Sequence, residues 1–145
     1  GDHVCRMLGA RMVDRSGESL TFASIDSEFG LEMTYVILEG PNGPVIPNFH
    51  FFTGGQCAFI TTPRQVSSLP IGQHRATVWL PPSLLNEGTY SVNFAATTMI
   101  PQCIHFHVQD QFCFQVIEDL HDEARHGYVH QVPGAVRPQL NWSLE

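Results

Sequence analysis

Apolar and polar residues alternate with a period of two along most of this chain of 145 residues. Leu31, Met33 and Tyr35, for example, are separated by Glu32 and Thr34. Strict alternation of this kind is typical of half-buried antiparallel strands, because successive side chains of a strand point to opposite faces. Clusters of glycine, proline and asparagine separate the alternating stretches and indicate turns between strands.

The pattern predicts many short strands and almost no helix. The strands are expected at about residues 3–13, 19–25, 30–39, 45–53, 56–62, 73–80, 89–98, 102–109 and 111–118. The one helical candidate is a single turn at 81–85. Short strands with turn residues between them predict one all-β domain over residues 1–145, a jelly-roll or immunoglobulin-like antiparallel β-sandwich.

The alternation stops near residue 119, and residues 119–145 are expected to form an extended tail. The tail carries Trp142, whose large indole is expected to be buried against its own sandwich or against a partner's. The tail is therefore a candidate for a terminal strand exchanged between two copies of the chain.

Charge and composition exclude several functions. The chain has 7 Lys+Arg against 14 Asp+Glu, a net charge of -7, and every basic residue is arginine. Without lysine the fragment has no phosphate-loop lysine and no Schiff base. An acidic chain with scattered arginines lacks the basic stripe that nucleic acids require, so no nucleic-acid partner is expected.

Four cysteines, Cys5, Cys57, Cys103 and Cys113, have no C-x-x-C spacing among them. A structural zinc cluster is therefore not expected, and neither is a cofactor. Their neighbours are apolar, and a chain of this length builds its core without cross-links. We therefore expect buried free thiols in preference to disulfides.

His105 and His107 form an H-x-H pair on one predicted strand, and both rings are expected on the same face. Two such imidazoles can share a divalent metal if neighbouring strands supply more ligands, for which His50 and Asp110 are candidates. The pair resembles the start of a cupin metal motif, but the glutamate and glycine that should follow are replaced. A cupin-like metalloenzyme remains the alternative, and groove-lining histidines without metal are favoured.

Nucleophilic catalysis has little support in the sequence. The chain has no G-x-S-x-G motif, and no cysteine has a recognisable histidine partner. Its carboxylates cannot be placed in pairs across a sugar ring from sequence alone. The fragment is therefore expected not to be an enzyme, and no catalytic or metal-binding residue is predicted.

A binding face is better supported. If the strands near 73–80, 89–98 and 102–109 are neighbours, their outward positions form a polar surface with one large aromatic residue. The candidate carbohydrate-binding residues are Arg75, Thr77, Trp79, Asn93, His105 and His107, with His50 extending the surface. Sugars bind to this combination, because an aromatic plane packs on their C–H faces and polar side chains bond their hydroxyls. The alternative is a core tryptophan beside polar residues that merely face water.

A family resemblance sharpens this interpretation. The stretch Pro82–Val92 is similar to the "P-x-L-L-x-x-G-x-Y" segment of the C-terminal carbohydrate-binding domain of O-antigen polysaccharide ABC exporters of the Wzt type. Other short motifs agree in order over nearly the whole chain. They are Asp14–Gly17, Thr53–Phe59, Gly72–Arg75, Phe112–Val116 and Gly134–Pro138 with Trp142.

The resemblance implies a jelly-roll sandwich, a homodimer that exchanges its terminal strand, and recognition of the finished, often capped, end of an O-antigen polysaccharide. It also implies a non-catalytic module in a longer chain whose ATP-binding domain lies outside this fragment. The implied partner is the membrane-spanning exporter subunit, and the implied location is the cytoplasmic face of the inner membrane. No family motif selects the groove residues, so the candidate residues rest on the strand-face argument alone.

Overall fold

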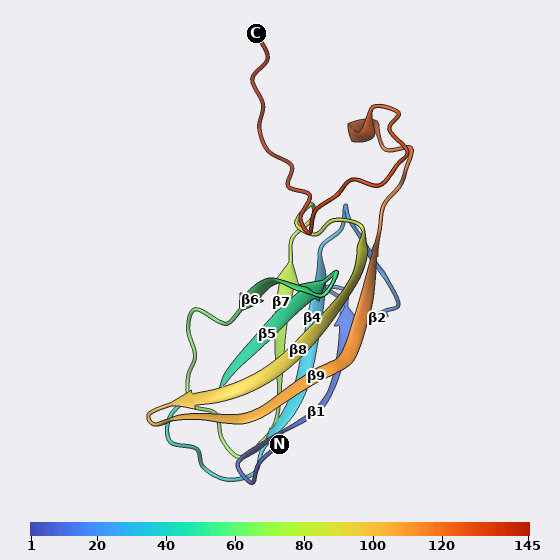
Figure 1. Cartoon of the computed structure of the whole chain (residues 1–145). Coiled ribbons are helices and arrows are strands. Elements are labelled where there is room, and N and C mark those ends of the chain that lie inside the picture. Colours follow the sequence, from blue (N-terminus) through green and yellow to red (C-terminus); the bar gives the residue numbers. More distant parts are fainter.

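Two β-sheets packed face to face make up the structure, a computed structural model that describes residues 1–145 (Figure 1). The four-stranded sheet runs in the order β2 (Ser19–Leu20), β1 (Cys5–Val13), β4 (Phe29–Ile37) and β7 (Gly72–Leu80). The five-stranded sheet runs in the order β3 (Ala23–Ser24), β9 (Gln102–Ile117), β8 (Gly88–Met99), β5 (Ile46–Thr53) and β6 (Gln56–Thr61). The predicted all-β sandwich is therefore confirmed.

The core lies between the sheets and is filled by the alternate apolar residues of the strands. Leu31 and Met33 of β4 are fully buried, whereas Glu32 between them points away from the core. Aromatic rings join the two layers, as where the rings of Phe29 and Phe114 lie 5.5 Å apart. Burying large side chains from both sheets is the main favourable term in the stability of such a sandwich.

Two predicted strand boundaries are wrong. The separate strands expected at 102–109 and 111–118 form one long strand, β9, because β8 pairs with it on both sides of Asp110, through Phe94 with Val108 and Val92 with Phe112. Asp110 itself adopts a left-handed conformation (φ 58°) at the irregularity between these pairs. The backbone N–H of Asp110 donates to Oδ1 of Asn93 at 3.2 Å, which holds this position against β8.

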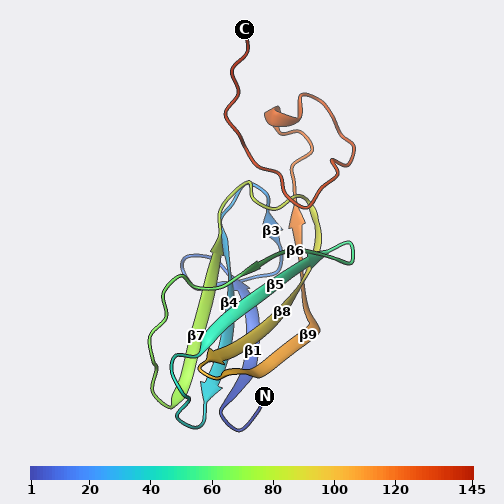
Figure 2. The same ribbon diagram turned by 60° about the vertical axis from the view of Figure 1, so that its left-hand side comes forward.

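The strand expected at 19–25 is divided between the sheets. Residues 19–20 pair with β1 in one sheet, and residues 23–24 pair with β9 in the other (Figure 2). The pairing of β3 with β9 is parallel, so the sandwich is antiparallel except at this short edge strand. The single turn expected at 81–85 forms no helix, and the one helical element is the three-residue 3-10 turn η1 (Glu123–Arg125). No helix of the chain is long and apolar enough to cross a membrane.

The tail leaves the sandwich after β9 and is anchored at its base by Asn86 and Tyr90. The Asn86 amide donates to the carbonyls of Val132 and Gly134 at 2.6 and 2.7 Å. The buried Tyr90 hydroxyl lies 2.7 Å from the carbonyl of Ala135. Both anchoring residues belong to the segment that carries the family resemblance, so this segment has a structural role in docking the tail.

A buried ionic cluster stabilises the same junction. Glu118 pairs with Arg125 and Arg137, and the Arg125 guanidinium also donates to the carbonyls of Tyr128 and His130. The side chains of Glu118 and Arg125 are only 5% and 2% exposed. A charge buried so deeply needs these partners, because desolvation without them costs several kcal/mol.

Beyond this junction the tail runs away from both sheets toward the C-terminus (Figure 1). Leu140, Trp142 and Leu144 are 69%, 83% and 90% exposed. Of the two positions expected for the Trp142 indole, packing on its own sandwich is therefore wrong, and packing on a partner's stays a prediction. The three exposed apolar residues recur with a period of two, as they do along a strand.

Candidate functional site

The seven candidate residues do not share one face. The expectation required the strands near 73–80, 89–98 and 102–109 to be neighbours, which is correct for the second and third strands and wrong for the first. Strand β7 lies beside β4 at the edge of the four-stranded sheet, whereas β8 lies between β9 and β5 in the other sheet. The outward residues of β7 therefore lie on the outside of the four-stranded sheet, and those of β8 and β9 lie on the outside of the five-stranded sheet.

Arg75, Thr77 and Trp79 lie on the outer surface of the four-stranded sheet, because Ala76, Val78 and Leu80 face the core. We call this surface the four-strand face and define it by Arg11, Glu32, Arg75, Thr77 and Trp79. Glu32 is 12% exposed and accepts a bond from Nε of Arg11 at 2.9 Å. The nearest guanidinium nitrogen of Arg75 lies 3.9 Å from the same carboxylate. Arg75 therefore already has an anionic neighbour within the chain.

Trp79 lies outside the core, and its ring is close to Arg15 and Gly30. The guanidinium carbon of Arg15 lies 3.9 Å from the ring centroid. Gly30, opposite Trp79 on β4, lies close enough that an added Cβ would be 2.8 Å from the indole Cζ3. The interpretation of Trp79 as a core residue is therefore wrong, and the Arg15 guanidinium lies over one face of the indole.

His105 and His107 point to different sides of the sheet, so the expectation that their rings share a face is wrong. Ala96 pairs with Phe106 whereas Thr97 pairs with Ile104, so β9 carries one extra residue at His105. A bulge of this kind breaks the alternation of side chains. His105 is 6% exposed and contacts Thr98, whereas His107 faces solvent. The cupin-like alternative required both rings at one metal, and the bulge separates them.

His50, Asn93 and His107 do come together, on the outer surface of the five-stranded sheet. His50 is opposite Asn93 on β8, and His107 is opposite Ala95. The rings of His50 and His107 meet diagonally across β8, with centroids 5.3 Å apart. We define the five-strand face by the polar and aromatic residues around them, which are Asn48, His50, Phe52, Ser91, Asn93 and His107.

Hydrogen bonds orient the two imidazoles of this face. Nε2 of His50 donates to Oδ1 of Asn48 at 2.8 Å, and the Gln109 amide lies 3.4 Å from Nδ1 of His107. Burial, and secondly the neighbouring His107, lower the pKa of His50 below its usual value. His50 therefore favours its neutral form, which both donates and accepts hydrogen bonds.

Asn93 is 7% exposed and reaches the surface through one atom. Its Oδ1 accepts from the N–H of Asp110, and its Nδ2 has no partner within the chain. No fully buried side-chain nitrogen or oxygen lacks a partner, so this Nδ2 is accessible to solvent. A nearly buried amide with one free donor is well placed to select a hydroxyl or carbonyl.

A shallow hollow of about 280 Å³ adjoins this face at the end of β8. Phe52, Ser91, Asp110 and Cys113 line it together with the β5–β6 turn. Phe52 supplies an aromatic side chain beside the Ser91 hydroxyl, because the two residues are paired across β5 and β8. The sequence indicated Asn93, His50 and His107 for this face, but not that Asn48 and Asp110 complete it. Their roles depend on the order of the strands and on the left-handed conformation of Asp110. The alternation of apolar and polar residues predicts neither.

The cysteines are only partly as expected. All four are free, and Cys5 is buried, but Cys57, Cys103 and Cys113 are exposed. Cys57 and Cys113 alternate with core residues on their strands, so their thiols face outward. The apolar neighbours that suggested burial are the core-facing residues on either side.

Comparison with known proteins identifies the fold. No protein-family model matches the chain, and no curated protein matches it in sequence. Among solved structures, a crystal structure of the C-terminal domain of wzt matches with a TM-score of 0.79 and 14% identity. The match covers 100% of this chain and 86% of that chain.

The chain is thus a β-sandwich domain with a polar outer sheet face. Its fold is that of the Wzt C-terminal domain, as the motif resemblance predicted.

Proposed function

We propose that this chain is a non-catalytic carbohydrate-binding module that recognises the terminal residues of an O-antigen polysaccharide for export by an ABC transporter. The observation that carries the proposal is the fold similarity to the C-terminal domain of wzt over the whole chain. The order of the sequence motifs, from Asp14–Gly17 to Gly134–Pro138, adds independent support.

The five-strand face is the proposed binding surface. Phe52 and the two imidazoles supply aromatic edges and planes for sugar C–H groups, and Ser91 and Asn93 supply partners for hydroxyls. The four-strand face fits a glycan less well, because the Arg15 guanidinium already lies over the Trp79 ring and Gly30 lies close to the same indole. Binding there would require Arg15 to move away first.

The chemistry of the five-strand face favours uncharged sugar hydroxyls. A neutral His50 beside Asn48 and Asn93 offers donors and acceptors rather than a fixed positive charge. Arg75, which would suit an anionic glycan end, lies on the other face and close to Glu32. A face of few hydrogen bonds and one or two stacking contacts gives dissociation constants in the micromolar to millimolar range, about 4 to 8 kcal/mol.

We also propose that the domain acts as a homodimer through its tail. Leu140, Trp142 and Leu144 are too apolar to remain in water without a partner, and their period of two fits a strand added to the edge of a second copy. In the full-length chain, an ATP-binding domain would couple glycan recognition to the membrane-spanning exporter subunit. The module would then work at the cytoplasmic face of the inner membrane.

Titration with purified O-chains, with and without their terminal modification, tests the proposal. His107→Ala should weaken binding by about tenfold, which corresponds to ~1.4 kcal/mol. Thr77→Ala on the four-strand face is the matched control and should leave the affinity unchanged. An O-chain that does not bind the unaltered dimer would refute the function. Equal affinity for both variants would refute the proposed face.

A further inference from the structure

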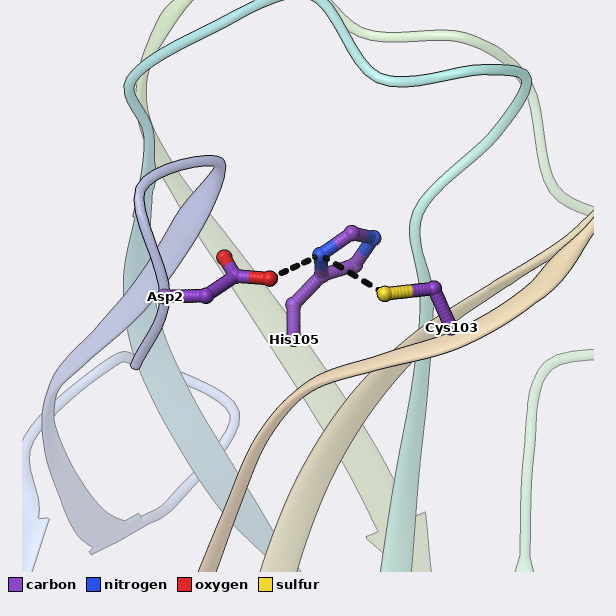
Figure 3. A group of neighbouring side chains, drawn as sticks. All are labelled: Asp2, Cys103 and His105. Carbon is purple, nitrogen blue, oxygen red and sulfur yellow. Dashed lines mark hydrogen bonds and ion pairs between the residues drawn. The ribbon is translucent and has the colours of Figure 1, made fainter.

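A second group of polar side chains lies on the opposite side of the sheet from His107, where the N-terminal segment meets β9 (Figure 3). Asp2, Cys103 and His105 place a carboxylate oxygen, a sulfur and a ring nitrogen within 4.8 Å of one another. Oδ2 of Asp2 lies 2.7 Å from Nδ1 of His105, and Sγ of Cys103 lies 3.8 Å from the same nitrogen. The three donor atoms therefore converge on one point.

This arrangement is not that of a nucleophilic triad. In a triad the nucleophile and the carboxylate lie at opposite nitrogens of the imidazole, so that a proton passes through the ring. Here the thiol and the carboxylate both approach Nδ1, and Nε2 lies 3.1 Å from the hydroxyl of Thr98. His105 therefore cannot act as a general base for the Cys103 thiol while Asp2 orients its other ring nitrogen.

We propose that Asp2, Cys103 and His105 bind one divalent cation of the zinc class. Sulfur, imidazole nitrogen and carboxylate oxygen are the ligands that zinc takes in proteins. A thiolate and a carboxylate balance the two charges of the ion, and binding releases the thiol proton of Cys103. Cys103 is exposed, so an ion can reach its sulfur from solvent.

Two of the three donor–donor distances can be compared with those of a zinc site. Tetrahedral zinc, with bonds of roughly 2.3 Å to sulfur and 2.0 Å to nitrogen and oxygen, separates sulfur from nitrogen by about 3.6 Å and nitrogen from oxygen by about 3.3 Å. The sulfur–nitrogen distance of 3.8 Å is already close to this value. The oxygen–nitrogen distance of 2.7 Å has to open by about 0.6 Å, which a small rotation of the Asp2 carboxylate provides.

Two of the ligands are already oriented by further hydrogen bonds. Oδ1 of Asp2 accepts from the backbone N–H groups of Val4 and Cys5 at 2.9 and 3.0 Å, which leaves Oδ2 directed at His105. In the metal-free chain Nδ1–H of His105 donates to Oδ2 of Asp2, because a carboxylate oxygen only accepts, and the Thr98 hydroxyl lies 3.1 Å from Nε2. An ion at Nδ1 would replace this hydrogen bond, the ring proton would move to Nε2, and the Thr98 hydroxyl would then accept from Nε2–H. Outer partners of this kind hold metal ligands in position.

A bound ion would join the two sheets. Asp2 leads into β1 of the four-stranded sheet, whereas Cys103 and His105 belong to β9 of the five-stranded sheet. Asp2 and His105 are 103 residues apart in sequence, so the ion would close a very long loop. The ion would therefore hold the N-terminal segment against β9. His107 is not a ligand, because it faces the other side of the sheet.

Zinc titration by calorimetry, followed by cobalt substitution, tests the site in the full chain. The unaltered protein should bind one zinc ion per chain, and cobalt should show the thiolate charge-transfer band and strong visible bands of a tetrahedral cysteine site. Cys103→Ser should lower the affinity at least tenfold and abolish the charge-transfer band. Cys113→Ser, an exposed thiol on the same strand, is the matched control and should change neither.

Further variants separate this site from other histidines. Thr98→Val should lower the affinity by about 10- to 100-fold while keeping all three ligands. His3→Ala and His50→Ala should have no effect. The proposal is overturned if the unaltered chain binds no zinc at 1:1 stoichiometry, or if Cys103→Ser and Cys113→Ser bind it equally. Loss of binding in His50→Ala would also overturn it, because the ion would then lie on the five-strand face.

Discussion

The imidazole rings of His50 and His107, from strands β5 and β9, lie 5.3 Å apart across β8. Neither strand is next to the other in the chain, and β8 separates them in the sheet. On β8 between them, Asn93 is opposite His50 and Ala95 is opposite His107, and both are buried. This pair marks the surface on which the proposed function depends.

The first prediction concerns the protonation of His50. Because burial and His107 lower its pKa in the folded chain, NMR should show His50 titrating below its ordinary value of 6.5. The unfolded chain then binds more protons than the folded chain, so this residue costs stability as the pH falls below about 6.5. His107→Ala should raise the pKa of His50 without fully restoring it, since the burial remains. Titration of His50 at or above 6.5 would contradict this account.

The second prediction concerns thiol reactivity. Cys5 is fully buried, and burial, together with the nearby Asp2 charge, raises the pKa of its thiol to about 11. Cys57, Cys103 and Cys113 are exposed. A thiol-reactive dye, with a chelator present, should therefore label three cysteines in the native chain and the fourth only after unfolding. If all four thiols reacted with the dye equally fast, the end of β1 that carries Cys5 would be accessible to solvent, which would contradict this prediction.

The third prediction uses the contact between Gly30 and Trp79. A Cβ at position 30 would lie 2.8 Å from the indole. Gly30→Ala should therefore displace Trp79 and destabilise the fold by about 1–3 kcal/mol, as overpacking does. Gly9→Ala is the control, because a Cβ at position 9 meets nothing within 4 Å. Urea unfolding followed by tryptophan fluorescence measures both, and equal stability of the two variants would argue against the close packing.

The fourth prediction concerns the base of the tail. Glu118→Gln leaves the guanidinium of Arg125 buried without its counter-charge. Breaking a buried pair in this way costs about 3–5 kcal/mol. Hydrogen exchange should therefore become faster in residues 119–137 than in the strands of the sandwich. Glu123→Gln, an exposed carboxylate in the same segment, should change the exchange little. Unaltered protection after Glu118→Gln would mean that other contacts hold the tail.

Alternation along the chain was sufficient to predict the strands and the sandwich, because burial on one face imposes a period of two. It did not predict which strands are neighbours, and so Arg75, Thr77 and Trp79 fell on the opposite face from Asn93. Sheet order depends on long-range pairing, which no local pattern contains.

Single-residue irregularities caused the other errors. The bulge at His105 turns its ring to the inner side of the sheet. At Asp110 the chain takes a left-handed conformation, and β9 continues past it because β8 pairs with both halves. Each feature disrupts the alternation of inward and outward side chains at one position only. The apolar and polar pattern on either side stays regular, so the sequence gives no sign of the change. The Asp2–His105 contact was equally hidden, since it joins residues at opposite ends of the chain.

The most direct test of the proposed binding surface is an amide chemical-shift map of the domain during titration with its O-chain. The account predicts saturable shifts centred on His50, Asn93 and His107, with little change on β7. Shifts centred instead on Thr77 and Trp79, with the five-strand face unchanged, would contradict it.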